Sequence, residues 1–553
     1  MTLPADRPWW QGAVLYQIYP RSFFDTNGDG IGDLPGVIAK LDYIAGLGVD
    51  GIWLSPFFAS PMRDFGYDVA DYLAVDPTMG TLADVDALLV EAHRLGLKVL
   101  IDQVWAHTSD QHAWFEASRA GEAGHADWYV WADPKPDGTP PNNWLSVFGG
   151  SAWSWSPRRR KYYLHPFLES QPKLDLGNQT VLDAVLSTGA FWLDRGVDGF
   201  RLDAVDFLRH DPALRDNPAV PPPRGVIPAK PFGLQRHLYD VGDEATVLPV
   251  LGRIRALTDR YPGAMTLAEV SSQPGAYDRI AAYTGPGRLH LAYTLKLLRE
   301  DLSPALFAEV LESAAAAIGA DALCWAFSNH DVARAAGRWL PPGAEGQVGD
   351  FAVLLTALLL SLPGTACLYQ GDELGLMDAS LTHDRLRDPF GIAYWPEFKG
   401  RDGSRTPMPW CAEAPHAGFS SAPETWLPVA AEHRALAIDR QEADPGSVLH
   451  RVRRLIAWRR EQPALRHGRL GRVRTEALVL AFERATPDDR LVAAFNMSPQ
   501  PATFSFGVDE AIIPSPDNGF NAHGFTTGFR DGTVRLPGFG VFFGVIEPAN
   551  TRS

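Results

Sequence analysis

Cysteine is scarce in this chain, and long apolar runs are absent. Three cysteines occur among 553 residues and no two form a CxxC pair, which excludes a disulfide framework and a zinc ribbon. The apolar run at 351–364 is too short to span a bilayer, so we expect a buried helix there. The first residues lack the basic and apolar regions of a signal peptide. We therefore expect a cytoplasmic protein without a membrane partner.

An excess of positive charge is also missing. Lysine and arginine total 50 against 66 acidic residues, so the formal net charge is -16. Such a field repels nucleic acid and anionic membranes, but it does not affect a neutral substrate. Hydrophobic residues make up 46% of the chain and 17 tryptophans are present, as in a globular enzyme or a carbohydrate-facing protein. We therefore expect a neutral small-molecule partner and no nucleic acid.

Short β-rich runs alternate with helical patterns along most of the chain. Between several of the runs lie amphipathic stretches such as 81–96, which has apolar residues at helical spacing and a glycine at its end. The candidate strands are 15–19, 51–54, 99–102, 199–204, 266–269, 289–293, 323–327 and 366–370. Eight such units predict an α/β fold, a (β/α)8 TIM barrel with its chemistry at the carboxyl ends of the strands.

Two segments are too long for simple loops. Residues 106–174, rich in Trp, Pro and Gly, predict an inserted domain after strand three, and a polar insertion at about 378–445 follows strand eight. From residue 470 onward, alternating runs predict a C-terminal antiparallel β-domain. The predicted division is a barrel of 1–105 and 175–469, an inserted domain of 106–174 and a β-domain of 470–553.

Several polar residues fall at the carboxyl ends of predicted strands. Any one of them alone is more readily a structural cap or an ion-pair partner, but a barrel would bring all of them together. The set lacks the Cys/His spacing of a transition-metal site, so it indicates acid–base and nucleophilic chemistry. These residues are Asp102, His107, Asp203, Glu269, His330 and Asp331.

Arg201 and Asp203 stand two positions apart in one predicted strand. Side chains alternate faces along a strand, so the two charges share a face. A cation within a few ångströms lowers the pKa of a carboxyl group. We therefore expect Arg201 to keep Asp203 ionised and ready to act as a nucleophile.

Four motifs, in order, carry a family resemblance. They are DQVWAH (102–107), GFRLDAV (199–205), AEV (268–270) and FSNHD (327–331), and together they resemble the α-amylase superfamily, glycoside hydrolase family 13. The stretches FGYDVADY (65–72) and GRDGSRTPMPW (400–410) resemble its α-glucosidase and oligo-1,6-glucosidase branch. The resemblance covers nearly the whole chain.

The resemblance implies a role for three acids. By motif, Asp203 is the nucleophile, Glu269 is the general acid and then the base, and Asp331 holds the sugar in its distorted transition state. In a retaining mechanism the nucleophile and the acid lie about 5 to 5.5 Å apart.

The resemblance also implies a substrate pocket. Asp102, His107, Arg201 and His330 would hydrogen-bond the terminal sugar, and Tyr67 would stack on it. Asp64 and Arg401 would pair to close the far side of the sugar pocket, which enforces exo action. The alternative for Tyr67 is a core residue, and the alternative for residues 401–405 is a solvated loop. Phe148 and Phe167 would line the mouth. Ala204, next to the nucleophile, favours α-1,4 bonds.

The loop DTNGDGIGD (25–33) has oxygen ligands at alternate positions. It matches positions 1, 3, 5, 6, 7 and 9 of an EF-hand loop, but Gly36 replaces the twelfth-position Glu. The resemblance implies a structural Ca²⁺ or Mg²⁺ held by Asp25, Asn27, Asp29, the carbonyl of Ile31 and Asp33. The alternative is an Asp/Asn/Gly turn without metal. No organic cofactor is expected.

Together these features predict a retaining exo-acting α-glucosidase that is a monomer or a homodimer. Its partners would be short α-glucosides, preferably α-1,4 and maltose-like, with sucrose as a further candidate. The reaction would pass through a covalent glucosyl-aspartate, with transglucosylation to alcohols. A sucrose isomerase or α-glucosyltransferase using the same intermediate is the alternative. A non-catalytic scaffold of the same fold is the remote alternative, since such scaffolds lack the catalytic acids.

Overall fold

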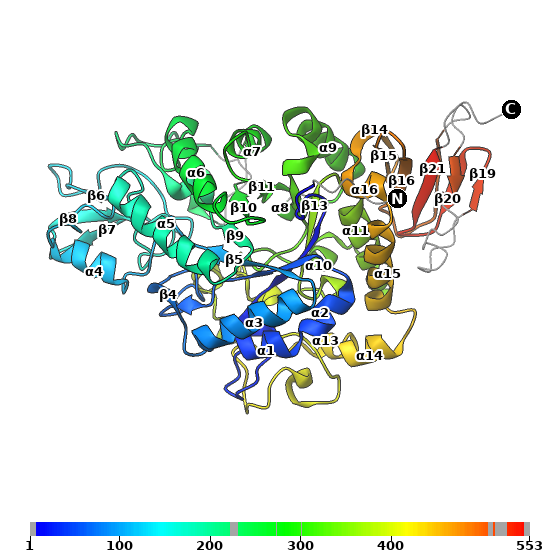
Figure 1. Ribbon diagram of the computed structural model, residues 1–553, viewed down its shortest axis with the longest axis horizontal. Coiled ribbons are helices and arrows are strands. Elements are labelled where there is room, and N and C mark those ends of the chain that lie inside the picture. Colours follow the sequence, from blue (N-terminus) through cyan, green and yellow to red (C-terminus); the bar gives the residue numbers. More distant parts are fainter. Residues whose placement is uncertain are drawn as a thin grey trace.

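The structure is a computed structural model that describes residues 7–221, 230–271, 274–299, 301–506, 512–514 and 528–546. The molecule is elongated in Figure 1. A central barrel lies between a small sheet formed by 131–164 on one side and the C-terminal sheets on the other.

Eight parallel strands form the central sheet. All eight predicted strands are present, in the order β11-β10-β9-β5-β2-β1-β13-β12. A parallel bridge between Ala292 and Leu323 joins the two edge strands, β11 and β12, and so closes the barrel. The prediction of a (β/α)8 barrel is therefore confirmed. The strands are β1 (Val14–Ile18), β2 (Gly51–Leu54), β5 (Lys98–Gln103), β9 (Gly199–Leu202), β10 (Met265–Val270), β11 (Leu291–Thr294), β12 (Cys324–Ala326) and β13 (Thr365–Tyr369).

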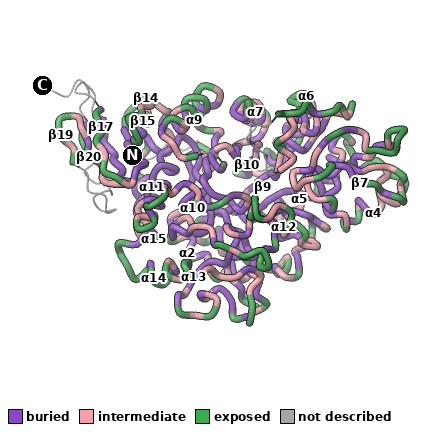
Figure 2. Tube along the Cα trace, turned by 180° about the vertical axis from the view of Figure 1, so that it is seen from behind, coloured by how far each residue is buried: buried purple, intermediate pink, exposed green. Residues whose placement is uncertain are grey.

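Helices cover the outside of the barrel, and the strands inside it are almost entirely buried (Figure 2). This burial explains why the strands are continuous apolar runs rather than alternating ones. The helices are α1 (Leu34–Ala39), α2 (Leu41–Leu47), α3 (Leu82–Arg94), α5 (Gln179–Asp194), α6 (Glu244–Thr258), α7 (Ala276–Tyr283), α8 (Lys296–Arg299), α9 (Pro304–Ala317), α10 (Ala335–Trp339), α11 (Val348–Ser361), α15 (Val448–Arg460) and α16 (Pro463–His467).

Local sequence sets where these helices begin. Thr81 and Asp84 form a capping box at the start of α3, so two backbone N–H groups at the helix end gain acceptors. Asn178 and Ser303 cap α5 and α9, each with a side-chain oxygen that accepts one backbone N–H. The apolar run predicted as a buried helix belongs to α11, whose residues 351–361 are all buried.

The segment after β5 builds a small unit of its own. It contains α4 (Ala113–Ala120) and an antiparallel sheet in the order β6-β8-β7, made of Trp131–Ala132, Lys161–Leu164 and Trp153–Ser156. Trp144, Trp153 and Leu164 lie in its separate apolar cluster. A short hairpin of β3 (Phe58–Ala59) and β4 (Asp71–Val75) precedes this unit.

The chain between β13 and α15 forms short helices and loops. The helices are η6 (Asp372–Leu374), η7 (His383–Arg385), α12 (Pro389–Tyr394), η8 (Asp402–Ser404), η9 (Pro415–Gly418), α13 (Ala431–Ala435) and α14 (Ile438–Ala443). Arg405 in this segment donates to the carbonyl oxygen of His330, which follows β12. The segment therefore reaches the carboxyl end of the barrel.

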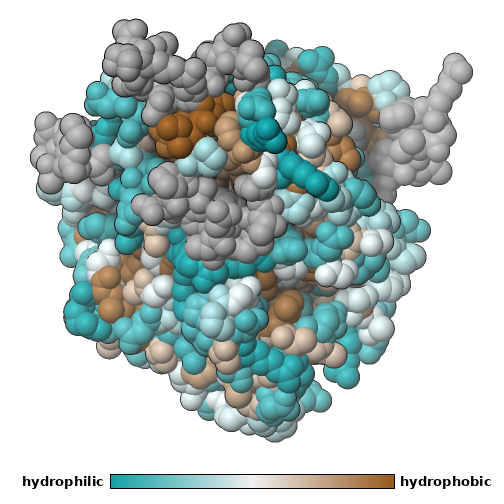
Figure 3. All heavy atoms as spheres, turned by 90° about the vertical axis from the view of Figure 1, so that its right-hand side faces the viewer, coloured by the Kyte–Doolittle hydropathy of each residue, from teal (hydrophilic) through white to brown (hydrophobic). Residues whose placement is uncertain are grey.

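Two antiparallel sheets form the C-terminal part. One has the order β14-β15-β16-β21-β18 and the other β17-β20-β19. The face on this side is largely hydrophilic, with scattered apolar patches (Figure 3). None of the helices in the described ranges is long and apolar enough to cross a membrane. The strands are β14 (Arg469–Glu476), β15 (Val479–Ala485), β16 (Arg490–Asn496), β17 (Ala502–Ser505), β18 (Ile512–Pro514), β19 (Gly528–Arg530), β20 (Thr533–Leu536) and β21 (Val541–Ile546).

Candidate active site

A cavity of about 480 Å³ opens at the carboxyl end of the barrel. Ten of the predicted site residues line it: Asp64, Tyr67, His107, Phe148, Phe167, Asp203, Ala204, Glu269, Asp331 and Arg401. Parallel strands of a barrel end at one rim, which is why residues far apart in the chain meet here.

Arg201 of β9 lies at the centre of a buried charge network. One of its nitrogens donates to Asp102 at 2.8 Å and to Asp203 at 2.7 Å. Its other terminal nitrogen contacts the Glu269 carboxylate and bonds the Tyr293 hydroxyl at 2.9 Å. Burial lowers the pKa of Arg201, but Asp102 and the other neighbours outweigh this effect and hold the pKa well above its ordinary value. The guanidinium therefore stays charged and ties three carboxylates together.

The pKa of Asp203 departs from our prediction that Arg201 keeps this carboxyl group ionised. Arg201 does lower the pKa of Asp203, but burial is the larger effect, and Asp102 and Asp331 add to it. The net result raises the pKa to about 7. The sequence showed the cation but did not show how little water reaches the carboxylate.

The residue after Asp203 has an unusual backbone. Ala204 has φ 42° and ψ 54°, in the left-handed region that non-glycine residues rarely adopt. There β9 ends and the chain turns into η2 (Val205–Leu208). The carboxylate of Asp203 thus projects from a sharp strand-to-turn junction.

Glu269 stands on β10, the strand next to β9. Its carboxylate accepts a hydrogen bond from the Tyr293 hydroxyl at 2.8 Å. The last paired residues of the two strands are Leu202 and Ala268, each directly before one of the acids. The register of the sheet therefore brings Asp203 and Glu269 side by side at the cavity.

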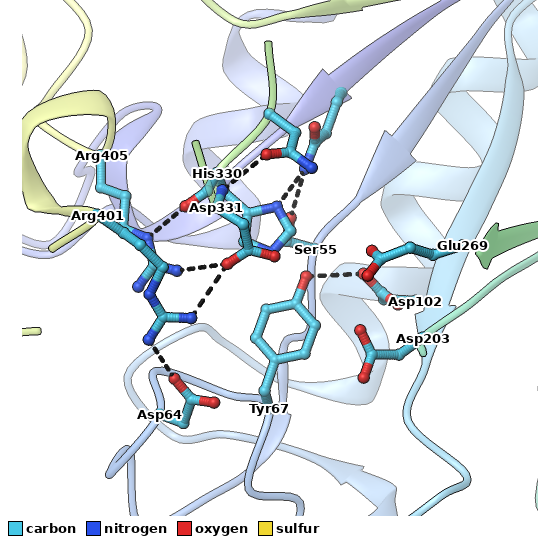
Figure 4. A network of polar contacts seen from close by, with 12 residues as sticks. Ser55, Asp64, Tyr67, Asp102, Asp203, Glu269, His330, Asp331, Arg401 and Arg405 are labelled. Carbon is cyan, nitrogen blue, oxygen red and sulfur yellow. Dashed lines mark hydrogen bonds and ion pairs between the residues drawn. The ribbon is translucent and has the colours of Figure 1, made fainter. Parts of the chain in front are cut away.

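Arg401 organises what we call the charged end of the cavity, formed by Asp64, Asp331, Asp388, Arg401 and Arg405. Arg401 donates to Asp64 at 2.7 Å, to Asp388 at 2.8 Å and to Asp331 at 3.0 Å. Arg405 also donates to Asp331, at 3.0 Å. Figure 4 shows Arg401 between Asp64 and Asp331, so the pairing of Asp64 with Arg401 that the resemblance implies is present.

His330 and the two arginines decide the charge of Asp331. Burial alone would raise the pKa of this carboxyl, but His330, Arg401 and Arg405 hold the pKa well below its usual range. Near neutral pH Asp331 is therefore ionised, whereas Asp203 is only partly ionised. The cavity has carboxyl groups in two different protonation regimes.

Tyr67 connects the two parts of the site. Its ring stacks on His330 with centroids 5.0 Å apart, and its hydroxyl donates to Asp102 at 2.9 Å. His107 bonds the carbonyl oxygen of Tyr67, and burial lowers the pKa of His107 to about 4, so the imidazole is neutral. Tyr67 faces the cavity but has little freedom to move.

Asp102, Arg201 and His330 lie one layer behind the cavity. All three are fully buried and none belongs to the lining. Their contacts are with lining residues: Arg201 bonds Asp203, while Asp102 and His330 hold Tyr67. Direct hydrogen bonds from these three to a sugar stay a prediction.

Five phenylalanines form a large part of the remaining lining, which we call the aromatic wall: Phe148, Phe167, Phe207, Phe232 and Phe390. The rings of Phe148 and Phe390 pack with centroids 4.9 Å apart, and those of Phe167 and Phe207 with centroids 5.1 Å apart. Val147 and Leu295 extend this surface. One end of the cavity is therefore charged and the other is largely apolar.

Known proteins show what this chain is similar to. The α-amylase catalytic-domain family matches residues 17–468. The chain belongs to the α-amylase family, glycoside hydrolase family 13. This confirms the resemblance drawn from the motifs, and with it the assignment as a glycoside hydrolase.

Three relatives show which enzymes of family 13 this chain is similar to. A probable α-glucosidase of Rhizobium meliloti is 50% identical over 98% of both chains. The crystal structure of the α-glucosyl transfer enzyme XgtA is 51% identical, covers 98% of this chain and 100% of that one, and has a TM-score of 0.93. The trehalulose synthase MutB of Pseudomonas mesoacidophila is 30% identical over the same shares, with a TM-score of 0.86. The chain is thus an enzyme of the α-glucosidase type.

The predicted metal loop lies away from this network. The Asp25 carboxylate accepts bonds from Gly28 N, Gly30 N and the Ser420 hydroxyl, and Asp33 caps α1. Across the described ranges, no three His, Cys, Asp or Glu side chains gather to hold a metal ion. An ion here would therefore also need Asn27 and the Ile31 carbonyl, as predicted; this all-oxygen donor set suits Ca²⁺ or Mg²⁺. The metal stays a prediction.

Sequence reasoning missed several residues of the site. Gln171 bonds both Asp64 and His107, Gln17 bonds His330, and Asp388 bonds Arg401. Others are the lining residues Asp206, Lys230 and His237. Gln17 and Tyr293 had a usable signal, because both stand in predicted strands. The others come from loops and from the short helix η2, where no periodicity predicts which residues face the cavity.

Proposed function

We propose that this protein is a retaining, exo-acting α-glucosidase that hydrolyses short α-glucosides through a covalent glucosyl-aspartate. One observation carries the proposal: Asp203, Glu269 and Asp331, which lie at or after the carboxyl ends of three different strands, face one cavity. A glycosidase needs a carboxylate to attack, a carboxyl group to protonate the leaving oxygen and a low-dielectric site around both. The non-catalytic scaffold is disfavoured because all three acids are present.

In the first step the Asp203 carboxylate attacks the anomeric carbon. The bond to the leaving oxygen breaks, and that oxygen takes the proton of Glu269. In the second step the Glu269 carboxylate removes a proton from water, which attacks the same carbon and releases Asp203. Glucose leaves with its α configuration retained, and Glu269 is protonated again.

Asp331 and the charged end would hold the terminal sugar. An ionised carboxylate fixed by two arginines suits hydrogen bonds from sugar hydroxyl groups that strengthen in the transition state. The Asp64–Arg401 pair would block extension beyond one glucosyl unit, which supports exo action. Ala204 supports maltose-like α-1,4 substrates, with discrimination of about 1 to 3 kcal/mol from so small a side chain.

The aromatic wall would receive the leaving group or an acceptor. Its apolar surface favours an alcohol with an apolar body over water once the glucosyl-enzyme has formed. The names of two relatives, a glucosyl transfer enzyme and a trehalulose synthase, support the alternative in which transfer or isomerisation is the main outcome. Both outcomes use the same two carboxylates.

A substrate panel tests this function. Maltose, isomaltose, sucrose, trehalose and maltotriose would be incubated with the enzyme and the product anomers followed over time. We expect α-glucose first, released fastest from maltose and maltotriose. If transfer or isomer products dominated at low acceptor concentration, the protein would be a glucosyltransferase or a sucrose isomerase rather than a hydrolase. A first product in the β form would contradict the retaining mechanism.

The variant Asp203→Ala accompanies the panel. We expect turnover to fall by at least about 10⁴-fold while the circular dichroism spectrum and the melting temperature stay near those of the parent. Turnover at the parent's rate would overturn the nucleophile assignment.

A further inference from the structure

The carboxylate of Asp206 lines the cavity, but the two-step reaction does not use it. It stands three residues after Asp203 and is 3% exposed. One of its oxygens accepts from the backbone N–H of Ser271 at 2.8 Å, and the other accepts from the hydroxyl of Tyr283 at 2.9 Å. Buried carboxylates are rare unless their oxygens have such partners.

These bonds join the two catalytic strands beyond the point where the sheet ends. Strands β9 and β10 pair last at Leu202 and Ala268. Past that pair, one chain turns into η2 and the other continues from Glu269 to Ser271. The Asp206–Ser271 bond therefore links the segment after the nucleophile to the segment after the acid.

Helix α7 supports the same junction from outside. Tyr283 and Arg279 both belong to α7; Arg279 donates to the Ser271 carbonyl at 3.2 Å and lies 3.6 Å from the Asp206 carboxylate. We call Asp206, Ser271, Arg279 and Tyr283 the Asp206 bracket. Its members come from three different elements, so it fixes their relative positions.

The backbone beside Asp203 needs such support. Ala204 is held in the left-handed region, and strained residues persist only where their surroundings determine them. Two backbone bonds hold the turn, from Phe207 N to the Ala204 carbonyl and from Gly242 N to the Asp206 carbonyl. The side-chain bonds of Asp206 anchor this same turn to β10.

We propose that Asp206 is a positioning residue that fixes the Asp203 carboxylate relative to Glu269. It acts through backbone segments rather than through the sugar, and it needs both of its oxygens as acceptors. Asn at this position keeps one acceptor oxygen and loses the charge that faces Arg279. Ala loses every one of these bonds.

The test compares Asp206→Ala, Asp206→Asn and Tyr283→Phe on two donors. Maltose needs a proton from Glu269 for its leaving group, whereas α-glucosyl fluoride does not. We expect kcat on maltose to fall by about 100-fold for Asp206→Ala and about 10-fold for Asp206→Asn, because small misplacements of reacting groups are costly. Tyr283→Phe leaves the Ser271 bond and should cost less than either.

Two further readouts separate positioning from general stability. KM for maltose should stay within about threefold of the parent, because the charged end is untouched. The loss of kcat on maltose should exceed the loss of kcat on α-glucosyl fluoride. The position of Asp203 relative to Glu269 matters most for maltose, because only that donor needs both groups in the same step. Equal losses on both donors would overturn the link to Glu269.

A matched control lies at the opposite end of the barrel. Asp198 accepts from Lys98, from His93 and from the backbone of Val99, far from the cavity lining. We expect Asp198→Asn to lower the melting temperature but to keep kcat. If the Asp206 variants lose stability to the same extent and keep kcat within about twofold, the positioning role is wrong.

Discussion

At the charged end of the cavity two arginines bind carboxylates, while a few ångströms away the aromatic wall carries mostly ring carbons. Arg401 lies at the boundary, because its guanidinium also stacks over Phe148 at 5.1 Å. The difference indicates a division of labour. Directional bonds recognise the one sugar that every substrate shares, whereas an apolar surface accepts leaving groups and acceptors of different shapes.

Among changes that compare the two ends of the cavity, the largest effect should follow from removing the cation of the charged end. Arg401→Ala leaves Asp64, Asp331 and Asp388 close together without their common partner. Removing one member of a buried charge network costs several kcal/mol, so we expect kcat/KM on maltose to fall by at least about 100-fold.

The control for this change is Arg94→Ala, which removes an exposed arginine paired with Glu91 on α3. It should leave kcat/KM unchanged. If Arg401→Ala behaved like the control, the charged end would not recognise the sugar.

A smaller effect is expected from the aromatic wall. Phe232 lines the cavity and stacks on His237 with centroids 3.6 Å apart. Phe232→Ala should reduce transfer to benzyl alcohol, relative to hydrolysis, by roughly 10-fold, because the acceptor loses contact with one half-buried apolar ring. Hydrolysis of maltose should change less. Equal losses of transfer and hydrolysis would show that the two ends of the cavity do not act separately.

The acid limb of the pH profile tests the contrast between the carboxylates. Burial raises the pKa of Asp203 to about 7, and only its ionised form attacks, so kcat/KM should fall as the pH drops through about 7. Asp331 should add nothing in this range, because its pKa is held low. An acid limb near pH 4, the ordinary carboxyl range, would mean that Arg201 outweighs burial.

The smallest effect concerns the predicted metal loop. Chelation should lower the melting temperature by a few degrees, and added Ca²⁺ should restore it, because a ligand of the folded state stabilises by mass action. Activity well below the melting temperature should not change. If neither the chelator nor Ca²⁺ changed the melting temperature, residues 25–33 would be a turn without metal.

The sequence predicted the barrel well, because the eight strands are buried on both faces and read as short, mostly apolar runs. The polar residues that proved to matter follow at their carboxyl ends. Asp203, Glu269 and Asp331 were visible for the same reason. Gln171 and Asp388 were not, since they lie in long loops whose course depends on tertiary contacts. The protonation of Asp203 was also out of reach, because it depends on burial as well as on the neighbouring Arg201.

The most direct test of the central claim is to trap the reaction intermediate. A fluorinated glucosyl fluoride that forms the glucosyl-enzyme quickly and releases it slowly would be mixed with the protein, which would then be digested and analysed by mass spectrometry. The account predicts the added mass of one fluorinated glucosyl group on the peptide that contains Asp203 and none on the Asp203→Ala variant. A label on another carboxylate, or no label during turnover, would contradict it.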